Sequence, residues 1–160
     1  MDKLKIVKLV LDELDKRVNI LVQAALDAKD AATNEESKAE NKYDTRGLEA
    51  SYLAGAQAQR ANELVDSIRK LKELKITHYS DNDEINITSL VEVMDDSRNY
   101  KWFFILPYAA GIEITYKDLN IQTLSPQTPL AKKLIGQSKG DLIEWKSKNN
   151  IFEYEVSKIF

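Results

Sequence analysis

The 160-residue chain contains no cysteine and a single histidine, His78. Without cysteine it can form neither disulfide bonds nor thiolate metal sites, and one histidine cannot supply the usual histidine ligand sets for zinc. No apolar run reaches the roughly 18 residues that a membrane span needs, and the N-terminus MDKLKIVKLVLDELDK has too many charges for a signal-peptide core. We therefore expect a cytoplasmic protein that does not associate with membranes.

The net charge is small, −3, but acidic residues outnumber basic ones between residues 27 and 49. Direct binding to a phosphate backbone needs a basic surface, so we do not expect the chain to bind DNA or RNA independently. A cation or a basic cavity suits this acidic segment better. His78 has no accompanying acid or serine that would indicate a catalytic triad.

Apolar residues spaced three and four apart predict two long helices that form an antiparallel coiled-coil hairpin over residues 1–76. Large residues meet at one end of the hairpin, and alanines meet near the polar elbow at residues 33–46. Alanine keeps that half slim and favours helix with little packing support. About 30 residues at a rise of about 1.5 Å give a length of about 45 Å. The predicted facing positions are Leu4, Val7, Leu11, Leu14, Val18, Leu21, Ala25, Ala28 and Ala32, then Ala50, Ala54, Gln57, Ala61, Leu64, Ile68 and Leu71.

The periodicity changes near Thr77, and residues 77–86 have the composition of a polar linker. Beyond it, alternating segments predict hairpins formed by residues 90–94 with 100–106, 111–116 with 119–124, and 142–146 with 151–156. One short helix is expected at residues 130–135, with Thr128 as N-cap, Pro129 at the first position and Gly136 at the end. Residues 87–160 are thus predicted to be an α+β domain with an antiparallel sheet.

The strand with Trp102, Phe103 and Phe104 could indicate a ligand pocket. Alternation places Trp102 and Phe104 on one face and Phe103 on the other, which is more typical of core residues plus a docking patch.

The elbow sequence Glu40-Asn41-Lys42-Tyr43, the long helix after it and the C-terminal stretch SPQTPLAKKLIG, followed by Gly140-Asp141, resemble the bacterial Gre transcript cleavage factors GreA and GreB. The resemblance covers nearly the whole chain and is strongest in the C-terminal stretch. It implies an FKBP-like C-terminal domain that docks on RNA polymerase, while the coiled coil enters the secondary channel. Despite the kinship of that fold with prolyl isomerases, we assign no isomerase activity.

The resemblance also implies that the tip acids Glu40 and Glu36 help hold a second Mg²⁺ in the polymerase active centre, where water is activated to cut backtracked RNA. Mg²⁺ prefers oxygen ligands, so a carboxylate delivered by the tip can support it. Gre tips resemble Asp-Leu-Lys-Glu-Asn, and Ser37 stands here at the position of the earlier acid. Glu36 can replace that acid if the elbow is shifted by one residue, or if Glu36 and Glu40 lie one helical turn apart.

Contacts with the polymerase are expected from two sets of residues. The elbow set is Asn41, Tyr43 and Arg46, and the set in the loop before the short helix is Ser125, Pro126, Thr128 and Pro129. Simpler interpretations remain open at each place. The elbow acids can form a solvated turn, Asp44 or Thr45 can cap the second helix, and the start of a helix explains the loop prolines by itself.

Three hypotheses follow. The first is a Gre-like elongation factor, monomeric and not an enzyme in isolation, which lends a carboxylate to the polymerase, with Mg²⁺ bound only in that complex and nucleic acid met only through it. The second is a secondary-channel regulator that does not stimulate cleavage, which Ser37 favours. The third is a structural coiled coil that associates with itself.

Overall fold

The computed structural model describes residues 1–33, 45–147 and 150–160. The chain divides into two compact units. Residues 12–69 form the helical unit, and residues 1–11 together with 70–160 form the C-terminal unit. The predicted fold class, two long N-terminal helices followed by a small sheet domain with one short helix, is confirmed.

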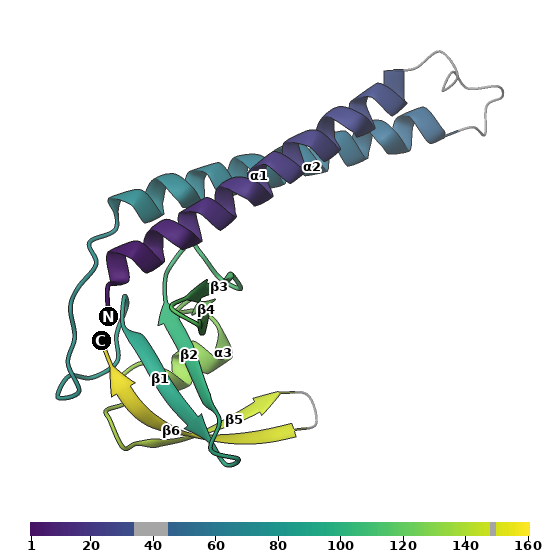
Figure 1. The fold of residues 1–160 in the computed structure, drawn as a ribbon. Helices are drawn as coiled ribbons and strands as arrows, with labels where there is room; N and C mark the ends of the chain where they lie inside the picture. Colours follow the sequence, from purple (N-terminus) through teal and green to yellow (C-terminus); the bar gives the residue numbers. More distant parts are fainter. Residues whose placement is uncertain (34–44, 148–149) are drawn as a thin grey trace. The chain divides into compact units, whose positions relative to one another are not determined.

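The two long helices, α1 (Lys3–Thr33) and α2 (Arg46–Glu73), pack side by side in the helical unit (Figure 1). The predicted facing positions of α2 are all buried or half-buried, whereas Leu48, Tyr52 and Val65 are exposed. In α1, Leu14 and Ala28 are buried. None of the described helices is long and apolar enough to cross a membrane.

The predicted seam of α1 is wrong at its first position. Leu4 is 65% exposed, whereas Lys3 is only 1% exposed and Ile6 and Val10 are fully buried. A stripe that begins at residue 3 fits the three-and-four spacing as well as one that begins at residue 4. Lysine is rarely buried, so an apolar pattern does not reveal Lys3 as a buried position.

One polar residue, Gln57, occupies a facing position of α2. Its Oε1 atom is buried, and no hydrogen-bond partner for it is found among the described residues. A buried acceptor without a partner destabilises the folded state. The position therefore weakens the hairpin locally, in the half where the facing residues are alanines.

The six-stranded sheet has the order β3-β4-β2-β1-β6-β5 (Figure 1). The three predicted hairpins are present as antiparallel pairs, and Lys117 and Asp118, both with positive φ, form the two-residue turn between β3 and β4. The strands are β1 (Leu90–Asp95), β2 (Tyr100–Ile105), β3 (Glu113–Tyr116), β4 (Leu119–Leu124), β5 (Leu142–Ser147) and β6 (Asn150–Ile159).

One detail of the predicted sheet is wrong, because the sheet is mixed rather than wholly antiparallel. Strand β4 pairs with β2 in parallel, so the β3–β4 hairpin is added to the sheet through its second strand. Alternation of apolar residues shows which side chains share a face, but it does not show which strands are neighbours.

The short helix α3 (Pro129–Leu134) begins and ends as predicted. Thr128 is its N-cap, with Oγ1 accepting a hydrogen bond from Ala131 N at 3.4 Å, and Gly136 follows with φ +84°. Apolar residues of α3 pack against one face of the sheet and form the core of the C-terminal unit. This core includes Leu130, Ala131, Leu134, Val91, Val93, Phe103, Ile105, Ile143, Tyr154 and Val156.

We expect Gln57→Met to stabilise the chain by about 1 kcal/mol, because a side chain of similar volume removes the unpaired buried acceptor. Urea unfolding followed by circular dichroism measures the change. The matched control is Gln59→Met on the same helix, where the exposed Gln59 amide donates to Glu63 at 3.0 Å and the change should stay within about 0.5 kcal/mol. A destabilised Gln57→Met variant would contradict the interpretation.

Candidate functional site: the elbow and a pocket on the sheet

The predicted tip residues Glu36, Glu40, Asn41 and Tyr43 lie outside the described residues, and Arg46 is the first residue of α2. The helix ends on either side are well defined. The Thr33 hydroxyl donates to the Lys29 carbonyl at 3.1 Å, and the Thr45 hydroxyl donates to the Glu49 carboxylate at 2.7 Å.

The start of α2 is suited to negative charge. Glu49 is the acidic residue of its first turn, and its backbone N–H donates to the Thr45 carbonyl at 2.9 Å. A carboxylate near a helix N-terminus interacts favourably with the helix dipole. These contacts support Thr45 as the residue that starts α2, one of the two capping residues considered from the sequence.

Between α1 and α2, small side chains leave a shallow apolar groove of about 430 Å³. Val22 and Leu26 of α1 lie along it, each with more than two fifths of its surface exposed. The other lining residues are Ala25, Lys29, Ala54, Gly55, Ala58, Ala61 and Asn62. Alanines and glycine thus make this half of the hairpin slim, as the sequence predicted.

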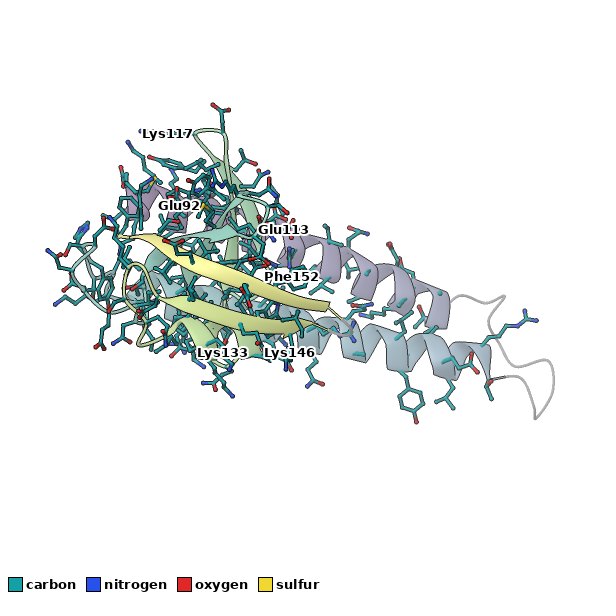
Figure 2. The ribbon with its side chains drawn as sticks, turned by 90° about the horizontal axis from the view of Figure 1, so that it is seen from below. Glu92, Glu113, Lys117, Lys133, Lys146 and Phe152 are labelled. Carbon is teal, nitrogen blue, oxygen red and sulfur yellow. The ribbon has the colours of Figure 1, made fainter. Side chains whose placement is uncertain are left out.

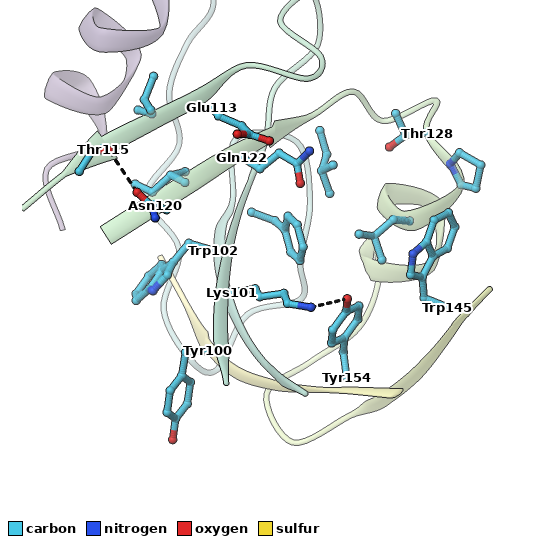
Figure 3. Close-up of a pocket in the computed structure, with 16 residues that line it drawn as sticks. Tyr100, Lys101, Trp102, Glu113, Thr115, Asn120, Gln122, Thr128, Trp145 and Tyr154 are labelled. Carbon is cyan, nitrogen blue, oxygen red and sulfur yellow. Dashed lines mark hydrogen bonds between the residues drawn. The ribbon is translucent and has the colours of Figure 1, made fainter. Parts of the chain in front are cut away.

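The larger cavity, about 890 Å³, is a pocket on the sheet of the C-terminal unit (Figure 3). Its walls come from β2, β3, β4, the start of α3, β5 and β6, and aromatic rings make up much of them. The lining residues are Tyr100, Lys101, Trp102, Phe103, Glu113, Ile114, Thr115, Asn120, Ile121, Gln122, Leu124, Thr128, Pro129, Leu130, Trp145 and Tyr154.

Lys101 points across the pocket towards Tyr154 (Figure 3). Its Nζ donates to the Tyr154 hydroxyl at 3.1 Å, lies 3.6 Å from Asp95 Oδ2, and sits 5.0 and 5.6 Å from the ring centres of Tyr154 and Phe152. Burial acts to lower the pKa of Lys101, but the Tyr154 hydrogen bond and the Asp95 carboxylate outweigh it, so the pKa is raised. The pocket therefore holds a fixed positive charge between aromatic rings.

The pocket has two different ends. Glu113 and Gln122 lie at one end, and Thr128 and Trp145 lie at the other, beside α3 (Figure 3). At the first end the Thr115 hydroxyl donates to Asn120 Oδ1 at 3.1 Å, which ties β3 to β4.

Exposed lysines also stand on α3 and β5, namely Lys133 and Lys146 (Figure 2). Because side chains alternate along a strand, Lys146 faces the opposite side of the sheet from Trp145. Lys146 is paired with Glu144 at 3.2 Å.

The structure brings the predicted loop residues to this second end. Thr128 and Pro129 line the pocket, and Ser125 accepts hydrogen bonds at its carbonyl from both the backbone and the hydroxyl of Thr128, at 2.9 and 2.8 Å. Pro126 lies half-buried in the same turn. The loop is thus a fixed turn at the pocket rim.

Sequence reasoning missed Lys101, Trp145 and Tyr154 as candidate site residues. Trp145 and Tyr154 stand on the predicted β5–β6 hairpin, but Lys101 on β2 is far from them in the sequence, and only the strand order brings it close. The one available signal was a lysine inside the aromatic segment Tyr100-Lys101-Trp102-Phe103. The predicted alternation is visible, since Trp102 stacks on Phe160 at 5.9 Å and Phe103 packs edge-on against Tyr154 at 6.3 Å.

Among residues 1–33, 45–147 and 150–160, no group of three or more acidic or histidine side chains could hold a metal ion. The proposed Mg²⁺-supporting acids, Glu36 and Glu40, lie outside these ranges.

Comparison with known proteins identifies the family of this chain. The family model described as transcription elongation factor, GreA/GreB, C-term matches residues 80–160. The transcription elongation factor GreA of Lachnoclostridium phytofermentans is 31% identical over 118 residues, covering 69% of this chain and 68% of that protein. GreA of Bartonella tribocorum is 27% identical over 115 residues, covering 69% of each. The chain belongs to the GreA/GreB family of transcription elongation factors.

Among solved structures, GreA factor homolog 1 (Gfh1) of Thermus thermophilus is similar at 21% identity, with 94% of each chain covered and a TM-score of 0.41.

Proposed function

We propose that this elongation factor binds RNA polymerase through the pocket face of its C-terminal unit and inserts the elbow between α1 and α2 into the secondary channel. There Glu40 and Glu36 help hold Mg²⁺ for cleavage of backtracked RNA. The match of residues 80–160 to the GreA/GreB family is the observation that carries this proposal. The cytoplasm, where bacterial transcription takes place, is its proposed location.

The pocket suits a protein segment as its occupant. Aromatic side chains in concave, desolvated places dominate the binding energy of many protein interfaces, and Trp145 and Tyr154 stand in such a place. The charged Lys101 in its lining favours a segment that carries acidic residues or exposed carbonyl groups. Ser125, Pro126, Thr128 and Pro129 would contact the same segment from the rim.

The elbow would supply chemistry that the polymerase completes. One or two carboxylates are enough to recruit Mg²⁺ when other acids and phosphate oxygens already surround it. Asn41, Tyr43 and Arg46 would hold the elbow against the channel wall. The chain would lend ligands without carrying out cleavage itself, so the isolated protein is not an enzyme under this proposal.

A second candidate is a channel regulator that binds without stimulating cleavage. The presence of Ser37 where Gre tips carry an acid favours it. Such a protein would change initiation, pausing or fidelity by occupying the channel. The same experiment separates the two functions.

In stalled, backtracked elongation complexes with labelled RNA, we expect wild-type protein to release the 3′ fragment. Glu40→Ala should slow release about tenfold or more, because a metal-supporting group is lost. Glu36→Ala should also slow release, and Glu35→Ala, which removes an acid not assigned to the metal, is the matched control. Polymerase binding, measured in parallel, should be unchanged in all three variants.

Two outcomes would contradict the cleavage mechanism. Equal release by Glu40→Ala and wild type would remove Glu40 from the mechanism. Polymerase binding by the wild type without any RNA release would establish the regulator instead.

We expect Trp145→Ala to weaken polymerase binding by about tenfold or more, the loss typical of an aromatic hot spot. The matched control is Leu142→Ala on the same strand, because Leu142 is 73% exposed and does not line the pocket. Binding is measured by titration against labelled polymerase, with circular dichroism to verify folding. Equal affinities for the two variants would place the docking surface elsewhere.

Self-association is the third function considered, and the exposed Val22 and Leu26 beside the groove are the observation that favours it. We expect a monomer in sedimentation equilibrium at micromolar concentration. A dimer that Val22→Glu dissociates would support the structural alternative.

A further inference from the structure

Lys3, in the first turn of α1, is a fully enclosed lysine, with 1% of its surface exposed. Its Nζ donates to the carbonyls of Thr77, Thr88 and Phe160, the last two at 2.8 Å. An ammonium group has three protons to donate, so these acceptors match it completely. They come from the segment after α2, the segment before β1 and the residue that follows β6, all within the C-terminal unit.

An aromatic ring also contacts the Lys3 ammonium group. The ring of Tyr79 lies 4.9 Å from Nζ, at a distance suited to a cation–π contact, and its hydroxyl donates to the Ile87 carbonyl at 2.8 Å. The ring is thereby fixed in place beside the ammonium.

Thr88 adopts a strained backbone conformation at this site. Its φ is +69°, which is rare for a β-branched residue, and hydrogen bonds hold it there. The Thr88 N–H donates to the Ile105 carbonyl at 2.8 Å, and its Oγ1 accepts from Thr77 N at 3.0 Å. The Thr88 carbonyl remains directed to Lys3.

We propose that the Thr77, Thr88 and Phe160 carbonyls with the Tyr79 ring form a binding site for a primary ammonium group, and that Lys3 is its built-in ligand. Lys3 thereby anchors the first turn of α1 to the C-terminal unit. Lys3 is thus a positioning residue for the first turn of α1 within the C-terminal unit.

A binding site for an ammonium group requires a hydrogen-bond donor at position 3, whereas ordinary packing requires only a side chain that fills the space. An isosteric apolar side chain at position 3 would fill the space but remove the Lys3 donor from the Thr77 and Thr88 carbonyls, while the Phe160 oxygen would keep its hydrogen bond from Leu90 N at 3.0 Å. A free alkylammonium ion could replace the side chain if the space were vacated. Burial lowers the pKa of Lys3 to about 8, which leaves the ammonium form predominant at neutral pH.

The test is chemical rescue of Lys3→Ala at pH 7, followed by thermal unfolding. We expect a lower Tm than wild type, and recovery of at least about half of the loss with n-propylammonium chloride compared with equimolar sodium chloride, as mass action predicts for a ligand of the folded state. Lys3→Met, which fills the space, should lose stability without rescue. Lys5→Ala is the matched control, since exposed Lys5 is paired with Asp2 at 3.2 Å and should show neither effect.

Two outcomes would overturn the proposal of an ammonium site. In one, propylammonium shifts the Tm of every variant equally. In the other, Lys3→Ala is as stable as wild type. Should Lys3→Ala not fold, the wild-type chain with isotope-labelled lysine decides by NMR. We expect one lysine ammonium to be protected from exchange and to titrate below the others, and uniform titration of all lysines would contradict the proposal.

Discussion

The parallel pairing of β2 with β4 is the interaction on which the C-terminal unit depends. It joins the β3–β4 hairpin to the remaining strands and aligns Trp102 with Ile121 and Phe103 with Gln122. The pocket exists because of this register, since its floor and one wall come from the two paired strands. The start of α3 then closes the opposite side, where Thr128 both caps the helix and lines the pocket.

Local structure was largely predictable from the sequence. The three-and-four spacing predicted both long helices, the turn residues predicted all three hairpins, and Thr128 with Pro129 predicted the start of α3. These features depend on residues near one another in the chain. Pairing of β4 with β2 depends on a distant neighbour, so alternation alone could not predict it.

The candidate site was predictable only in part, for the same reason. Thr128 and Pro129 are predictable because they begin a helix, whereas Lys101 on β2 reaches Trp145 and Tyr154 of the β5–β6 hairpin only through the strand order. Lys3 was missed because a charged residue is discounted in a search for buried positions, and its acceptors are backbone carbonyls, which no side-chain pattern reveals. The predicted acids Glu36 and Glu40 lie outside the described residues, so their role rests on the family resemblance.

The two units differ in how tightly they are packed, and each suits a different part of the proposed function. The C-terminal unit has a core, a pocket with a fixed charge and a short helix at its rim, which suits stable docking. The helical unit has a narrow seam of small residues and a buried Gln57 oxygen with no hydrogen-bond partner in the described part of the chain, so it gains little from packing in its alanine-rich half. Under the proposed function, this weaker packing is the cost of a hairpin slim enough to enter the polymerase channel.

Site-specific photo-crosslinking tests the central claim most directly. A photoreactive amino acid replaces Tyr43 in one preparation and Trp145 in another, and each is irradiated in complex with RNA polymerase. The account predicts that the Tyr43 probe attaches to the polymerase beside its active centre, whereas the Trp145 probe attaches to its outer surface. A Tyr43 probe that links only to the outer surface, or to a second copy of this chain, would contradict insertion of the elbow into the channel.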